Sequence, residues 1–167
     1  MPPNDTVSLS PSADPAALQP NIGAVLSEVA RLLRRRFERR ARETGLPLTR
    51  HQARTLLSIA RDEGLSQAAI ATALAIEPIA LVRMLDRLHE EGLVERRPHP
   101  TDRRVRTLWL TTAGWGVVER VLVINAEVRE EACAGLAPKA RQALRQALDQ
   151  MRDNLTLSDE SQNVAAD

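Results

Sequence analysis

The sequence lacks features that would place it outside a reducing cytoplasm. Its 167 residues include one cysteine, Cys133, so no disulfide can form within the chain. No apolar run approaches the length of a membrane span, and the first residues show no signal-peptide pattern. These absences predict a cytoplasmic protein with no membrane partner.

Motifs that carry catalysis or hold cofactors are also missing. There is no glycine-rich phosphate loop, no His-Glu-x-x-His motif, and no Ser, His and Asp set in a suitable context. The three histidines, His51, His89 and His99, share no spacing typical of metal ligands. We therefore expect no enzyme activity, no metal site and no cofactor.

Charges of the two signs nearly cancel over the whole chain but are unevenly distributed along it. The net charge is only +1, which by itself says nothing about a partner. However, residues 31–61 hold ten arginines against two glutamates, whereas acids outnumber bases nine to six from Thr107 onward. A basic body with an acidic end points to a polyanion partner, with solvated helix faces as the alternative interpretation.

The most informative stretch is Glu77–Thr111, which begins with an amphipathic helix. Pro78 suits the first helical position, where its missing N–H costs nothing. Gly92 is a typical helix end. Between them, apolar residues recur at helical spacing: Leu81, Val82, Leu85 and Leu88.

A β-hairpin is expected directly after this helix. Residues 93–97 and 103–110 suit strands, and the turn between them contains Pro98, Pro100 and Asp102. Arginines stand at both sides of this turn, which gives the hairpin a basic tip. A helix followed by a hairpin with a basic tip has the shape of a winged helix-turn-helix, which binds DNA.

The other helices are marked by their caps and apolar stripes. The first runs from Ile22 to Thr44, and Thr49 with Gln52 forms a capping box for the second. Ser66 caps a short third helix, whose turn, Ala75-Ile76-Glu77, lacks glycine. After Thr111 or Thr112 a long apolar helix follows, and a second one restarts at Pro138.

The long helices exceed what a small winged helix needs to cover itself, so we expect a dimerisation bundle. The predicted fold is mainly α with a small β-hairpin wing, that is, a winged helix-turn-helix plus a helical dimerisation region. The expected organisation is a disordered tail (1–20), dimerisation helix 1 (21–47), a DNA-binding lobe (48–111), dimerisation helices 5 and 6 (112–157) and a frayed tail (158–167).

A family resemblance agrees with this interpretation. The segments LVRMLDRLHEEGLVERRPHPTDRR and LWLTTAG resemble the MarR family of winged-helix transcription regulators, and its SlyA-like branch most closely. The resemblance extends over roughly residues 21–155. It implies a homodimer on a pseudo-palindromic operator in double-stranded DNA, acting as a repressor that a small-molecule effector releases.

The resemblance also implies roles for individual residues. In the family, the Asp of a D-R-R motif braces an arginine of the wing tip, and the tip enters the minor groove, where arginine suits the concentrated negative potential. From the recognition helix, Arg83 is the best candidate for a bidentate guanine contact. The expected DNA-binding residues are Ser66, Gln67, Glu77, Pro78, Ile79, Ala80, Arg83, Arg87, Asp102, Arg103 and Arg104.

The arginines near the end of the first helix suggest an anionic effector. Arginine is abundant there, whereas Phe37, Trp109 and Trp115 are the only aromatic residues of the chain. We expect an aromatic acid or its coenzyme A thioester, in a pocket lined by the first two helices and the start of the fifth. The alternative is a solvated face with pairs such as Glu38–Arg42. The expected ligand-binding residues are Arg36, Phe37, Arg39, Arg40, His51, Arg54 and Trp115.

A thiol-based redox sensor is the alternative function. Some proteins of the MarR family use a cysteine near the N-terminal helix, whereas Cys133 lies late in a long helix, beside Glu130 and Glu131. Acidic neighbours raise the pKa of a thiol and so lower its reactivity. Packing is therefore the better interpretation of Cys133.

Overall fold

The computed structural model describes residues 21–46, 48–102 and 104–164, with side chains described as far as Thr156. The predicted fold class is confirmed, because the chain is mostly helical with one two-stranded antiparallel hairpin. The elements in chain order are α1 (Ile22–Glu43), α2 (Arg50–Arg61), α3 (Gln67–Leu74), α4 (Pro78–Glu90), β1 (Val94–Pro98), β2 (Arg106–Leu110), α5 (Thr112–Ala132) and α6 (Pro138–Val164).

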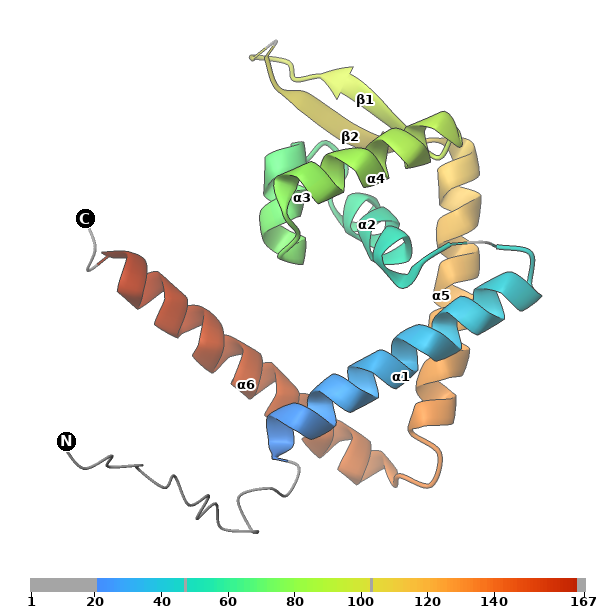
Figure 1. Ribbon diagram of the computed structural model, residues 1–167, viewed down its shortest axis with the longest axis vertical. Coiled ribbons are helices and arrows are strands. Elements are labelled where there is room, and N and C mark those ends of the chain that lie inside the picture. The colour runs from blue at the N-terminus through green and yellow to red at the C-terminus, as the bar shows by residue number, and fades with distance from the viewer. Residues whose placement is uncertain (1–20, 47, 103, 165–167) are drawn as a thin grey trace, which may run out of the picture.

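Two regions are connected through α5 (Figure 1). The winged-helix lobe, which consists of α2, α3, α4 and the β1–β2 hairpin, packs against the first part of α5. The helical arms are α1, which crosses α5 further along, and α6, which leaves the end of α5 and runs obliquely back, with its C-terminal end apart from the lobe. The lobe is thereby held at one end of a long helix, with the arms at the other.

The helix starts are those that the sequence predicts. The Thr49 side chain accepts from the N–H of Gln52 while the Gln52 side chain accepts from the N–H of Thr49, so the capping box is complete. Ser66 caps α3 and Thr111 caps α5 through the same kind of side-chain acceptor. Each cap satisfies amide groups that have no partner within the helix.

The turn of the helix-turn-helix is formed without glycine. Ala75 ends α3 with a φ of 50°, in the left-handed region that glycine usually occupies at a helix end. Pro78 then begins α4 at its first position, and Gly92 ends the connection to β1 with a φ of +70°. The recognition helix is thus bounded as predicted.

The hairpin is shorter than the sequence suggested. Its second strand begins at Arg106 rather than at residue 103, because Val105 turns back and donates its N–H to the Asp102 carbonyl. Leu108 and Leu110 share the buried face of β2, as expected, and Val94 pairs with Leu110 across the hairpin. The wing base is therefore part of the core, and its tip is not.

The hydrophobic core lies mainly in the lobe and at its contact with α1 and α5. On α5, the buried face includes Val121 and Ile124, whereas Trp115 and Leu122 are exposed. The largest fully buried side chains are those of Phe37, Leu56, Ile59, Ile70, Leu81, Leu85, Leu88, Leu108, Val94, Val121 and Thr55.

The arms carry exposed apolar side chains. No side chain that the structure describes on α6 is buried, and the helix continues to Val164, past position 158 where we expected fraying. In the described ranges no single helix is long and apolar enough to cross a membrane; the bent pair α3 and α4 passes by length and composition only. The exposed large apolar residues of the arms are Ile22, Val25, Val29, Leu32, Leu144, Leu148 and Leu155, and those of α5 are Trp115, Leu122 and Val123.

Candidate nucleic-acid interface

The recognition helix α4 presents a polar and basic outer face. Its inner face is buried through Leu81, Leu85 and Leu88, which leaves Arg83 and Arg87 exposed on the surface. The N-terminal residues expected to meet base edges, Glu77, Pro78, Ile79 and Ala80, are all exposed, and Ser66 and Gln67 at the start of α3 are half-buried.

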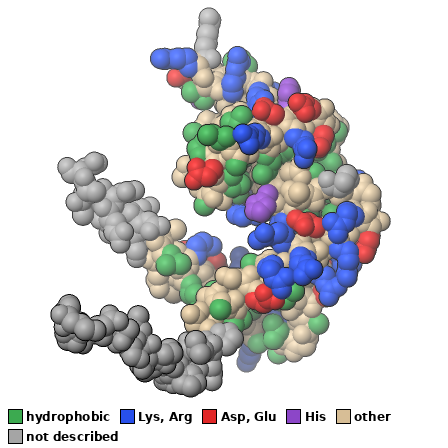
Figure 2. Space-filling model, viewed as in Figure 1, with side chains coloured by type: hydrophobic (Ala, Val, Ile, Leu, Met, Phe, Trp, Pro, Cys, Tyr) green, Lys and Arg blue, Asp and Glu red, His purple; other side chains and the backbone are tan. Residues whose placement is uncertain are grey.

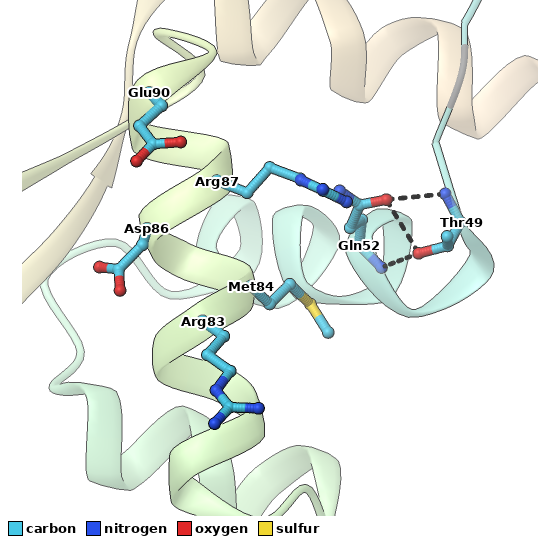
Figure 3. A pocket seen from close by; sticks show the side chains of 7 residues that line it. All are labelled: Thr49, Gln52, Arg83, Met84, Asp86, Arg87 and Glu90. Atoms are coloured by element: carbon cyan, nitrogen blue, oxygen red, sulfur yellow. Dashed lines mark hydrogen bonds between the residues drawn. The ribbon is translucent and has the colours of Figure 1, made fainter.

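A hollow of about 540 Å³ lies between α4 and the start of α2 (Figure 3). Arg87 extends across it toward the capping box formed by Thr49 and Gln52, and Met84 lines it between them. Sequence reasoning placed Arg83 and Arg87 among the DNA-binding residues but did not find this neighbour, because the contact joins two helices that are separated in the sequence.

The wing tip shows one part of the expected brace. The Asp102 carboxylate accepts from the backbone N–H of Arg104 at 2.9 Å and lies 3.7 Å from its Nε. The Arg104 side chain is 95% exposed, so its guanidinium group is available to a partner. Arg103, the other arginine of the motif, lies outside the described residues.

The wing is attached to the recognition helix by two contacts that the sequence did not reveal. Arg96 of β1 donates from Nη2 to Oδ1 of Asp86 on α4 at 2.6 Å. His89 Nδ1 lies 2.8 Å from the carbonyl oxygen of Val94. Both contacts link α4 to β1, so they fix the wing relative to the helix.

The other edge of the wing is held by the loop between α2 and α3. A Glu63 carboxylate oxygen accepts the N–H of Leu110 at 2.9 Å, and Gly64 donates its N–H to the Leu108 carbonyl at 2.9 Å. The ring of Trp109 covers Gly64, and the Arg97 guanidinium lies over that ring, 4.5 Å from its centroid. The hairpin base is therefore clamped on both sides.

The expected effector arginines are engaged with acids of α5. Arg36 Nε lies 3.0 Å from Glu131, and Arg40 contacts both Glu127 at 2.8 Å and Glu131 at 3.2 Å. The hydrogen bond that Arg40 donates to Glu131 raises the pKa of Arg40 above its usual value. Arg39 pairs within α1, with Glu43 at 3.6 Å.

The structure does not bring the whole predicted effector set together. Phe37 is fully buried beneath the Arg50 guanidinium, and burial lowers the pKa of Arg50. The hollow at Arg36, about 280 Å³, is bounded by Val128 and Glu131 at the far end of α5, whereas Trp115 lies in the first turn of that helix. His51 and Arg54 are exposed on α2.

Basic side chains nevertheless gather visibly on the face that Figure 2 shows, over α1 and the adjoining part of the lobe. Arg35, Arg39 and Arg42 of α1 line a shallow hollow of about 550 Å³ together with Glu38. Glu38 does not pair with Arg42 as suggested; its carboxylate accepts the backbone N–H of Arg50 at 3.4 Å. The arginines that are frequent in the sequence of α1 therefore also gather on its surface.

Cys133 is half-buried and caps the end of α5. Its carbonyl oxygen accepts from Arg141 at 2.9 Å, which ties the break between α5 and α6. This contact is made by the backbone of Cys133, whose side chain is only partly buried.

Taken together, an exposed basic helix after a tight turn and a clamped hairpin with a basic tip define a winged helix-turn-helix. Residues 45–105, from the end of α1 to the wing tip, match the MarR family. The lobe is thus similar to the MarR family over these residues, in agreement with the resemblance that the sequence itself carries.

Solved structures agree over most of the chain. A MarR crystal structure is 25% identical with a TM-score of 0.74, and covers 81% of this chain and 91% of its own. CouR, a transcriptional repressor bound to a 23-mer DNA duplex, is 28% identical with a TM-score of 0.73, over 79% and 92%. A mutant MarR from E. coli complexed with operator DNA is 27% identical with a TM-score of 0.70, over 77% and 91%.

Proposed function

We propose that this protein is a homodimeric, sequence-specific DNA-binding transcription regulator that represses its targets. The observation that carries the proposal is the joint exposure, on one clamped lobe, of α4 with Arg83 and Arg87 and of the wing tip with Arg104. Two similar proteins, CouR and the E. coli MarR mutant, are bound to DNA in their structures. The residues that carry the resemblance also support the SlyA-like branch.

The proposed contacts divide between the two grooves. The N-terminal part of α4 reads base edges in the major groove, with Arg83 in bidentate contact with guanine. Arg104 and Arg103 of the wing approach the minor groove, where a narrow groove concentrates negative potential. Ser66 and Gln67 contribute backbone contacts at the start of α3.

The decisive first experiment is to sequence the DNA fragments that the purified protein retains, and then to titrate the Arg83→Ala variant. The Arg83→Ala variant should lose about 1–3 kcal/mol of operator-binding free energy, and its preference at one base pair per half-site should relax. Arg145→Ala, on the exposed part of α6, is the matched control and should leave binding unchanged. A uniform loss across all DNA sequences would make Arg83 a phosphate contact instead.

The homodimer is supported by the apolar side chains that the arms leave exposed, among them Val29 on α1 and Leu148 on α6. A second copy of the chain would cover them, and two recognition helices then predict half-site centres about 10–10.5 bp apart. Light scattering at low micromolar concentration should give a dimer without DNA. A stable monomer would contradict the proposal.

We further propose an anionic effector with an apolar or aromatic end, bound where α1 meets α5. The hollow at Arg36 has apolar walls from Val29, Leu33 and Val128, and a ligand carboxylate can replace Glu131 on the arginine. The effector must prefer the conformation that has left the operator, since equal affinity for both states shifts nothing.

A preformed protein–DNA complex tests the effector. Aromatic acids and their coenzyme A thioesters should release the DNA, and the response should weaken when Arg36, Arg39 and Arg40 are changed to Gln. The same change at Arg145 serves as the control, because this residue is 86% exposed on α6. Release by neutral or cationic compounds alone would leave these arginines as a solvated and ion-paired helix face.

A further inference from the structure

The recognition helix and the wing are held in register by one side-chain ion pair. Arg96 on β1 reaches Asp86 on α4, with 2.6 Å between Nη2 and Oδ1. The Arg96 side chain is only 23% exposed, and its Nε is buried without a hydrogen-bond partner among the described residues. Its guanidinium group is thus confined by the packing around it and directed at a single carboxylate.

The Asp86–Arg96 ion pair lies at a distance from the base of the hairpin, where it can limit rotation of the wing. The chain connection at Gly92 and the contact between His89 and the Val94 carbonyl hold the base of the hairpin, where α4 ends. Asp86 lies a turn earlier on α4, and Arg96 lies further along β1 toward the tip. Their bond therefore opposes rotation of the hairpin away from the helix about its base.

We propose that Asp86 and Arg96 are positioning residues for DNA recognition, whose ion pair sets the angle between α4 and the wing. In this arrangement Arg83 and Arg104 reach the major and minor grooves of one site at the same time. The proposal rests on the DNA-binding function proposed above. It assigns a role to a carboxylate that lies among the arginines expected to meet DNA.

Whether neutralising Asp86 weakens or strengthens DNA binding distinguishes a positioning role from a simple electrostatic effect. Asp86 follows Arg83 by three residues and precedes Arg87, so its negative charge stands close to the DNA phosphates in any complex that uses these arginines. Removing a negative charge there strengthens the Coulomb attraction to DNA. A positioning role predicts the opposite, namely weaker binding when the carboxylate is neutralised.

The test compares Asp86→Asn with Glu90→Gln in operator titrations. Glu90 lies one turn further on the same helix, is exposed and has no ion pair within the described part of the chain, so its variant has the same charge change without the brace. Asp86→Asn should weaken operator binding about 3- to 10-fold, because a dimer carries two such pairs and each is worth up to about a factor of five. Glu90→Gln should leave binding unchanged or slightly stronger.

Arg96 distinguishes a brace from a phosphate contact. For Arg96→Gln, the positioning role predicts an unchanged slope of log K against log salt, and no further loss when it is combined with Asp86→Asn. If Arg96 instead contacted a phosphate, the slope would fall by about one per lost contact. Additive losses in the double variant would also overturn the proposal.

Footprinting supplies a readout that general destabilisation would not produce. Hydroxyl-radical protection by the wing, on the flanks of the site, should weaken in Asp86→Asn while protection around α4 remains. A thermal melt of the same variant should be close to that of the unchanged protein, since a half-exposed ion pair contributes little stability. If protection by the wing and by α4 weakened equally and the melting temperature fell, the ion pair would only stabilise the fold and would have no positioning role.

The two proposals fail in different ways. A protein that retains no DNA fragment overturns the DNA-binding function and this inference with it. A protein that binds its operator, but whose Asp86→Asn variant behaves like Glu90→Gln, overturns only the positioning role of Asp86 and Arg96.

Discussion

The winged-helix lobe and the helical arms differ in how completely they bury their own apolar residues. In the lobe, Leu56, Leu85 and Leu108 are fully buried, and even the hairpin contributes to the core. In the arms, α6 buries none of its described side chains, and Leu148 is 38% exposed. The lobe forms a core by itself and with α5, whereas the arms leave apolar faces exposed.

This difference indicates how the protein separates two tasks. A lobe with a complete core holds its DNA-facing residues in place without help from a second chain. In the dimer proposed above, the open apolar faces of the arms bring two such lobes together, so their packing decides the spacing of the two recognition helices. The proposed effector would change the contact between α1 and α5, and with it this spacing, without disturbing either lobe.

The largest expected effect on stability comes from a substitution in the lobe, Leu85→Ala, which we compare with Leu148→Ala in an arm. Leu85→Ala should cost about 2–5 kcal/mol of unfolding free energy, because it leaves a cavity in a closed core. Leu148→Ala should cost less, and its cost should depend on protein concentration, because it weakens a contact between copies. Urea denaturation at several protein concentrations measures both values.

The comparison would fail if the two variants lost equal stability with the same dependence on concentration. That result would mean that the arms bury Leu148 within one chain, or that the lobe cannot stay folded without the dimer. Circular dichroism before denaturation checks that each variant is folded at the start.

A smaller effect is expected where the lobe meets the arms, at two glycines of α5. A Cβ on Gly114 would lie 2.1 Å from the carbonyl oxygen of Leu93, whereas a Cβ on Gly116 meets nothing within 4 Å. Gly114→Ala should therefore cost about 1–3 kcal/mol through overpacking. Gly116→Ala should stabilise the helix by about 0.5–1 kcal/mol, because alanine loses less backbone entropy.

The two substitutions lie close together and are expected to change the stability in opposite directions, so they test how tightly the lobe packs against α5. Thermal melts of the two variants measure it directly. Stabilisation by both substitutions would show that Leu93 and the start of α5 can move apart, and hence that the lobe is less firmly fixed to the arms than the structure indicates.

Local features of this fold were predictable, whereas contacts between distant elements were not. The caps at Thr49, Ser66 and Thr111 follow from residue types at fixed spacing, so the helix starts were predicted correctly. The ion pair between Asp86 and Arg96 joins a helix to a strand, and no local pattern reveals it. The hairpin was likewise predicted, except that its second strand starts later.

The candidate effector site shows the same limit. The abundance of arginine on α1 was evident from the sequence, but the acids that engage Arg36 and Arg40 are Glu127 and Glu131 of α5. Only the crossing of the two helices brings these residues together. Helical periodicity also left open which side of α5 faces inward, so it could not tell that Trp115 is exposed.

The smallest expected effect concerns the break between α5 and α6, where acid should weaken an ion pair of the arms. Arg141 Nη1 lies 2.7 Å from Glu130 Oε2, and this hydrogen bond lowers the pKa of Glu130 below its ordinary value of 4.5. A lowered pKa means that the folded break prefers the ionised carboxylate. The stabilisation is therefore present above about pH 4.5 and is lost as the pH falls through the lowered pKa.

Amide hydrogen exchange in residues 133–141, corrected for its intrinsic pH dependence, measures this local stability. Protection should decrease below the ordinary carboxylate range in the unchanged protein, while Glu130→Gln should have lower protection at neutral pH and a smaller further loss in acid. Glu119→Gln, an exposed change on the same helix with no ion pair in the described part of the chain, should retain the original profile. An unchanged profile in Glu130→Gln would show that the hydrogen bonds from the Arg141 side chain to the carbonyls of Leu136 and Cys133 hold the break without the carboxylate.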